Sequence, residues 1–158
     1  MRLAHNGKTH HPHEPHTTMA TILIPIDGST HANRALAQLL QQRGHEAGLQ
    51  LHLLNVQTPN DSRSRTCHNA DELKQLYEAD GLAQLAPARQ LADNAGVAYQ
   101  HHIRIGHPAQ AIVRCAKELH ADEIVMGTHG RTGLMKLVMG SVAADVSQKS
   151  DIPVTLVK

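Results

Sequence analysis

Short apolar runs alternate with segments of helical periodicity along most of the chain. Residues 21–26, Thr-Ile-Leu-Ile-Pro-Ile, form an apolar run of strand length. Such a run is typical of a strand that is buried on both faces of a parallel sheet. Shorter apolar or weakly alternating runs occur at 49–56, 97–105, 123–126 and 153–157. We expect these five segments to be the β-strands of the protein.

The segments between the expected strands repeat their apolar residues at intervals of three and four. In the first of them, Ser29 can cap a helix and Gly44 can end it. We expect further helices to begin near Ala70, Pro108 and Ser141. The pattern thus predicts a helix in each connection between consecutive strands.

The second connection is the least regular. Residues 57–69 are mostly polar, so we expect a loop there. Pro87 lies within the helical pattern that follows. Proline removes a backbone hydrogen bond from a helix interior. We therefore expect the helix to be kinked or split at this residue.

The order of the expected elements defines the fold class. Helices that alternate with short apolar strands predict an α/β fold, with a parallel sheet and right-handed crossovers. A length of 158 residues suggests one domain that is large enough to bury a core.

The first 18 residues differ from the rest of the chain. They contain five histidines and two prolines, so we expect a disordered His-rich tail over 1–18 and a folded domain over 19–158. His10, His11, His13 and His16 could bind a transition metal in their neutral form. A flexible run fixes no coordination geometry, so we interpret the segment as a solvated tail.

Charge and cysteine content exclude several classes of partner. The 15 Lys and Arg residues nearly balance the 14 Asp and Glu residues, so we expect no nucleic-acid partner. No apolar run approaches the roughly 20 residues of a membrane span, and no signal-peptide pattern precedes the domain. Cys67 and Cys115 do not suggest a disulfide framework. Together these observations favour a cytoplasmic protein without a membrane partner.

The segment from Gly127 to Ser141 carries the most chemical information. It leaves the carboxyl end of an expected strand and enters the amino end of an expected helix, where open α/β sheets bind ligands. Glycines let backbone amides approach phosphate oxygens, and a helix N-terminus offers unpaired N–H groups. Arg131 and Lys136 add positive charge, and the segment contains no acidic residue. The segment suits an anion, although its glycines could simply shape a long connection.

The spacing of this segment resembles a known family. The glycines form neither a Walker A motif nor a Rossmann fingerprint. Instead, Gly127, Gly130, Gly140 and Ser141 follow the pattern Gly-x2-Gly-x9-Gly-Ser, which resembles the ATP-binding branch of the universal stress protein family. The similarity covers about residues 20–158. It implies a three-layer open sandwich, in which helices cover both faces of a five-stranded parallel sheet of order 3-2-1-4-5.

The resemblance also implies a site for ATP between the first and fourth strands. Asp27 would contact the ribose or a metal-bound phosphate, Pro25 and Val56 would line the adenine pocket, and Met126 would pack near the base. The residues implied around the phosphates are Gly127, Gly130, Gly140, Ser141 and Val142. A Mg²⁺ ion would be held mainly by phosphate and water. These residues also have a purely structural interpretation. Asp27 could end a strand and start a helix, and Val56 and Met126 could be ordinary core residues.

Three functions remain open from the sequence. We favour a stress-response regulator that binds ATP with little or no turnover, because the glycine segment holds no carboxylate to activate water. The second is a slow ATPase or nucleotidyl-transfer enzyme, with His129, Arg131 and Asp27 as candidates. We interpret His129 as an exposed loop residue and assign no catalytic residue. The third is a dimeric interaction protein whose site is empty.

The last expected strand predicts self-association. Residues 154–157 are apolar, and an exposed apolar edge strand promotes aggregation. Pairing with the same strand of a second copy would satisfy its backbone. The resemblance implies a homodimer formed in this way.

Overall fold

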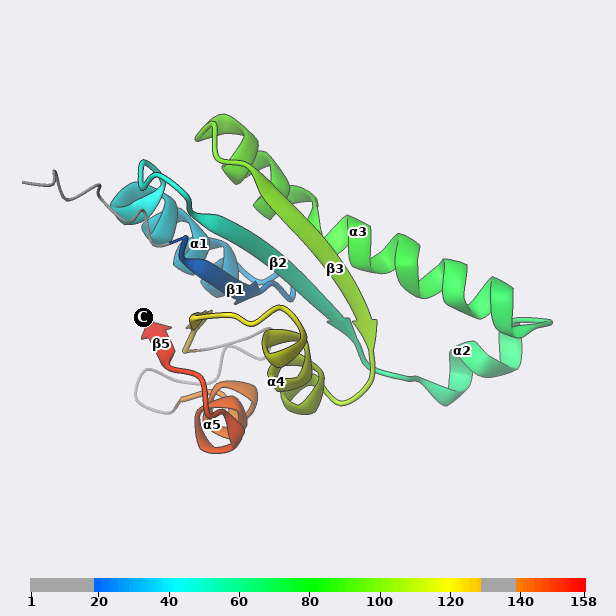
Figure 1. The fold of residues 1–158 in the computed structure, drawn as a ribbon. Coiled ribbons are helices and arrows are strands. Elements are labelled where there is room, and N and C mark those ends of the chain that lie inside the picture. The colour runs from blue at the N-terminus through cyan, green and yellow to red at the C-terminus, as the bar shows by residue number, and fades with distance from the viewer. Residues whose placement is uncertain (1–18, 129–138) are drawn as a thin grey trace, which may run out of the picture.

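The computed structural model describes residues 19–128 and 139–158, which form a five-stranded sheet covered by helices (Figure 1). The strands are β1 (Thr21–Pro25), β2 (Gln50–Gln57), β3 (Tyr99–Ile105), β4 (Glu123–Gly127) and β5 (Val154–Val157). All pairings are parallel, in the order β3-β2-β1-β4-β5. The expected α/β fold and strand order are confirmed.

Helices cover both faces of this sheet. They are α1 (Thr30–Arg43), α2 (Asp61–Thr66), α3 (Ala70–Asn94), α4 (Pro108–Glu118) and α5 (Ser141–Lys149). Helices α1 and α3 pack on one face, and α4 and α5 pack on the other, as Figure 1 shows for α3 above the sheet and α4 and α5 below it. The result is a three-layer sandwich. None of the described helices is long and apolar enough to cross a membrane.

The central strand β1 contributes to both halves of the core. Ile22 and Ile24 face α1 and α3, whereas Leu23 faces α4 and α5, and all three side chains are fully buried. Successive side chains of a strand point to opposite faces, so a strand between two helical layers must be apolar at every position. This requirement explains the continuous apolar run in the sequence.

Helix ends follow the expected capping chemistry. The Ser29 hydroxyl oxygen accepts a hydrogen bond from the Ala32 amide at 3.1 Å and so caps α1. At the other end, the amide of Gly44 donates to the carbonyl of Leu40. Pro108 occupies the first turn of α4, where its missing N–H group costs no hydrogen bond.

The second connection differs from the sequence expectation at two points. The polar stretch expected to be a loop contains α2, which buries none of its residues and so has no apolar periodicity. Its N-cap is Asn60, whose side chain accepts from the Ser62 amide at 2.9 Å. Of the kink or split expected at Pro87, the split is wrong, because α3 continues through this residue. Pro87 is exposed, whereas the nearby Leu85 and Ala88 are fully buried and pack against the sheet.

A histidine pair joins the neighbouring strands β2 and β3. His52 Nδ1 lies 2.9 Å from His102 Nε2, and the two rings stack with centroids 5.2 Å apart. Burial lowers the pKa of both rings, and the nearby charges of His52 and Arg104 lower the pKa of His102 further. Both rings are therefore neutral at pH 7, with one donating and the other accepting the shared hydrogen bond.

This pair predicts a loss of stability in mild acid. An unfolded histidine takes up a proton as pH falls through about 6.5. The folded pair takes up its protons only at lower pH, because the pKa values of both rings are lowered. The free energy of unfolding should therefore fall between pH 7.5 and 5.5, with a slope below about 1.4 kcal/mol per pH unit for each histidine. The substitution His102→Gln should flatten this dependence in urea titrations. Parallel pH profiles for the two proteins would contradict the assignment.

Candidate functional site

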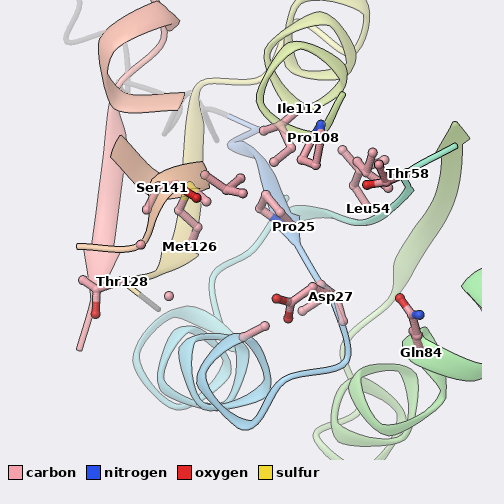
Figure 2. Close-up of a pocket in the computed structure, with 17 residues that line it drawn as sticks. Pro25, Asp27, Leu54, Thr58, Gln84, Pro108, Ile112, Met126, Thr128 and Ser141 are labelled. Atoms are coloured by element: carbon pink, nitrogen blue, oxygen red, sulfur yellow. The ribbon is translucent and has the colours of Figure 1, made fainter. Parts of the chain in front are cut away.

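A cavity of about 390 Å³ opens at the carboxyl ends of β1, β2 and β4 (Figure 2). The strand order brings these ends together, because β1 lies between β2 and β4. The first turns of α4 and α5 complete its walls. The lining residues are Pro25, Ile26, Asp27, Ala32, Leu54, Val56, Thr58, Gln84, Pro108, Ile112, Met126, Gly127, Thr128, Gly140, Ser141, Val142 and Ala143.

The structure brings together eight of the nine residues that the sequence analysis assigned to the site. These are Pro25, Asp27, Val56, Met126, Gly127, Gly140, Ser141 and Val142. The ninth, Gly130, lies outside the described residues, as do His129, Arg131 and Lys136. Segments about 100 residues apart in the chain thus share one cavity.

The turn from β1 to α1 presents a carboxylate to the cavity. Asp27 Oδ1 accepts a hydrogen bond from the Ser29 amide at 2.9 Å, which holds the side chain in place. Gly28 has φ of 84°, a left-handed conformation that residues with a Cβ rarely adopt. This conformation lets the chain turn sharply between the carboxylate and the helix cap.

The amino end of α5 forms the opposite wall, as Figure 2 shows for Ser141. The amide of Gly140 donates to the Thr128 carbonyl at 2.6 Å, so this bond ties the two ends of the glycine segment together. The first helical bond runs from the Ala144 amide to the Gly140 carbonyl. The amides of Ser141, Val142 and Ala143 have no acceptor among the described residues. They face the site with the positive end of the helix dipole.

An apolar wall completes the cavity on the side of α4. Its members come from the ends of three strands and from α4, and they are Pro25, Leu54, Val56, Pro108, Ile112 and Met126. Such a surface suits a flat heteroaromatic ring, which can pack against aliphatic side chains. Figure 2 places Leu54, Pro108 and Ile112 together on this side.

The sequence analysis missed several lining residues. The expected site did not include Leu54, Thr58, Gln84 or Ile112, which all line the cavity. Thr58 follows β2 directly and so lies at the ligand-binding edge of the sheet, which is a signal that the sequence offers. Gln84 lies within α3 and carries no such signal.

Charge is sparse in this cavity. Of the seventeen lining residues in the described part of the chain, only Asp27 is charged. The described residues contain no group of three or more His, Cys, Asp or Glu side chains that could hold a metal ion. A divalent cation here would need most of its ligands from a bound anion and from water.

Comparisons with known proteins agree with this geometry. The model of the universal stress protein family matches residues 19–158, and the chain belongs to this family. It is 31% identical to the universal stress protein MJ0531 of Methanocaldococcus jannaschii, over 87% of this chain and 81% of that protein. It is also 31% identical to YxiE of Bacillus subtilis, over 87% of this chain and 97% of that protein. By contrast, the chain spans 42% of a longer relative, Slr1230 of Synechocystis.

Solved structures of similar fold are also known. The structure of MJ0577, from Methanocaldococcus jannaschii, has a TM-score of 0.73 and 28% identity, and covers 89% of this chain and 96% of its own. A universal stress protein in complex with cAMP has a TM-score of 0.66 and 26% identity, and covers 88% of this chain and 97% of its own. Nucleotide binding is therefore found among the structural relatives of this chain.

Close packing of Gly127 predicts the effect of a substitution in the site. A Cβ at this position would lie 3.0 Å from the His31 carbonyl oxygen and 3.1 Å from its carbon, both backbone atoms of α1. The substitution Gly127→Ala should therefore displace the start of α1 and destabilise the protein by about 1–3 kcal/mol. Thermal unfolding followed by circular dichroism measures this change. An unchanged Tm would show that α1 is held less tightly than the contacts indicate.

Proposed function

We propose that this protein is a nucleotide-binding regulator that takes ATP in the cavity described above. The observation that carries the proposal is the meeting of three chemically distinct walls in one cavity of about 390 Å³. One wall is apolar, one presents a carboxylate, and one presents unpaired backbone amides. The apolar wall suits an adenine ring, the carboxylate suits a ribose, and the backbone amides suit a polyphosphate.

The phosphate end has the strongest physical basis. The amides of Ser141, Val142 and Ala143 combine with the dipole of α5 to favour an anion. The Ser141 hydroxyl adds another donor on the same wall. In this proposal Gly127, Gly130 and Gly140 leave room for the phosphate oxygens, because they carry no side chain.

The base and sugar occupy the remaining walls. Adenine packs against Pro25, Val56 and Met126, and the Val56 backbone supplies hydrogen bonds to its edge. Asp27 accepts hydrogen bonds from the ribose hydroxyls, since a carboxylate offers about four acceptor sites. A Mg²⁺ ion bound with ATP would bridge phosphate oxygens and water, with Asp27 as the nearest protein carboxylate among the lining residues.

We propose that turnover is slow or absent. Hydrolysis requires a group that orients or deprotonates a water molecule beside the terminal phosphate. Asp27 is the only charged side chain among the described lining residues, and it is tied to the β1–α1 turn. ATP would then act through its binding energy, by changing the affinity of the protein for partners. Both cysteines are free thiols, which fits a cytoplasmic location.

The substitution Asp27→Ala tests the nucleotide proposal. Loss of the carboxylate should weaken ATP and adenosine binding about tenfold, because hydrogen bonds to a charged group contribute about 1.5–3 kcal/mol. Titration calorimetry with ATP and Mg²⁺ measures the affinity, and release of phosphate from the same samples measures turnover. Absence of saturable binding to the native protein would refute the proposal.

Asp122→Ala is the matched control. The Asp122 carboxylate accepts a hydrogen bond from the Thr21 amide at 2.8 Å, so its loss also removes one carboxylate-to-backbone bond. It lies at the amino end of β1, opposite the cavity. Both variants should lose similar stability, but only Asp27→Ala should lose affinity. Equal losses of affinity would mean that binding follows stability rather than contact with Asp27.

We also propose that the protein forms a homodimer through β5. This strand lies at the edge of the sheet, next to β4 only. The carbonyls of Pro153 and Val157 accept bonds from the Ile124 and Thr128 amides, so alternate backbone groups of β5 point away from β4. Light scattering at micromolar concentration should give a mass of two chains. A monomer mass would contradict the pairing.

A further inference from the structure

The backbone ladder between β1 and β2 ends at the edge of the cavity. Pro25 and Leu54 are its last paired residues, and Figure 2 shows both side chains at the cavity. One further bond runs from the Ile26 amide to the Leu54 carbonyl at 2.7 Å. Beyond Ile26 the chain turns toward α1. The two strands therefore separate immediately after this bond.

The backbone of Val56 faces the side on which β1 has ended. Backbone groups of successive residues in a strand point alternately to its two neighbouring strands. The Leu54 carbonyl accepts from the Ile26 amide, on the side of β1. The Gln57 carbonyl accepts from the Gly106 amide, on the side of β3. By this alternation the N–H and C=O groups of Val56 point to the side of β1, where Val56 lines the cavity.

A side chain replaces the next bond of this ladder. In a continued parallel ladder the Val56 amide would donate to the Ile26 carbonyl. Instead, Asn55 Nδ2 donates to that carbonyl at 2.8 Å. The Val56 amide has no acceptor among the residues that the structure describes. The Asn55 side chain thus ties the end of β1 to β2 and leaves the next backbone donor of β2 unpaired.

Three neighbouring groups hold the Asn55 side chain in this orientation. Asn55 is fully buried. A carbonyl oxygen only accepts hydrogen bonds, so Nδ2 rather than Oδ1 must face Ile26. Asn55 Oδ1 accepts from Gln57 Nε2 at 2.7 Å, and Nδ2 also donates to Gln84 Oε1 at 2.8 Å. Both ends of the Asn55 amide therefore have partners, so the side chain is a fixed part of the interior.

We propose that Asn55 is a positioning residue for the base of the nucleotide. By occupying the Ile26 carbonyl, it keeps the Val56 N–H free to donate to a ring nitrogen of adenine. This inference rests on the proposed function and adds to it the residue that makes the backbone donor available. Asn55 acts through the backbone and does not contact the ligand, because it is fully buried. A base without the matching acceptor leaves the Val56 N–H unpaired and binds more weakly.

Amide hydrogen exchange in the free native protein tests the open donor directly. Leu54 is the internal reference, because it lies on the same strand and within the ladder to β1. In NMR experiments on the full chain, the Val56 amide should exchange at least tenfold faster than the Leu54 amide. Saturating adenosine should slow the Val56 amide at least tenfold, because the base then occupies it.

Removal of the Asn55 amide should close the ladder. In Asn55→Ala the Ile26 carbonyl has no side-chain partner, so the Val56 amide should bond to it. The exchange rate of Val56 in the free variant should fall to within about threefold of that of Leu54. The ratio of the two rates corrects for a lower global stability, because global unfolding exposes both amides equally.

Deaza analogues of adenosine test the same bond from the side of the ligand. The probes are adenosine and its 1-deaza, 3-deaza and 7-deaza analogues, in each of which a C–H group replaces one ring nitrogen. Titration calorimetry on the native protein should give one analogue an affinity about tenfold below that of adenosine. In Asn55→Ala this ratio should shrink to within about threefold.

Gln57→Ala is the matched control. It removes a neighbouring amide of the same network but leaves the bond from Asn55 to Ile26 in place. Its Tm should therefore fall, as that of Asn55→Ala should, because each variant leaves buried polar groups without a partner. Gln57→Ala should nevertheless retain both the fast exchange of Val56 and the full ratio between adenosine and the weakest analogue.

The outcomes distinguish this inference from the proposal on which it rests. If the Val56 amide of the free native protein exchanges as slowly as the Leu54 amide, the role of Asn55 is refuted without any variant. It is also refuted if the native protein binds all three analogues as tightly as adenosine, or if Asn55→Ala keeps the native ratio. If the native protein binds neither ATP nor adenosine, the nucleotide assignment fails first and the role of Asn55 fails with it.

Discussion

The position of β1 at the centre of the sheet is the constraint on which the rest of the structure depends. β1 is hydrogen-bonded to β2 on one side and to β4 on the other. Connections leave a parallel sheet from its carboxyl edge. The connection after β1 leads to α1 on one face, and the connection after β4 leads to α5 on the other face. The strand ends therefore separate there and leave an opening. The carboxylate of Asp27 and the first turn of α5 meet across that opening although they are far apart in the chain.

Burial and ligand binding place different demands on the residues at this edge. Ile22, Leu23 and Ile24 are fully buried and stabilise the sandwich from both faces. Immediately beyond them, Asp27 and Gly28 serve a turn whose conformation few other residues permit. Stability thus comes from the middle of the strands, whereas the chemistry lies at their ends. This division explains how one fold keeps a rigid core and still places amides and a carboxylate at the cavity.

The amide network of Asn55, Gln57 and Gln84 joins these two regions. Asn55 is buried in the α3 side of the sheet, where an unpaired amide would be costly. Its bonds to Ile26 and to Gln84 satisfy it and link β1, β2 and α3 at the base of the cavity. The same bonds that stabilise the interior orient Gln84 at the surface of the site.

The sequence by itself determined the alternation of the five strands with helices and the helix caps at Ser29 and Gly44, because local periodicity and spacing encode them. It did not reveal α2, which buries no side chain and so leaves no apolar pattern. It suggested a kink or a split at Pro87, and the split does not occur, because tertiary packing of Leu85 and Ala88 against the sheet outweighs the local cost of proline. Only the tertiary structure brought Gln84 to the same cavity as Asp27, since α3 and the end of β1 meet through folding and share no local signal.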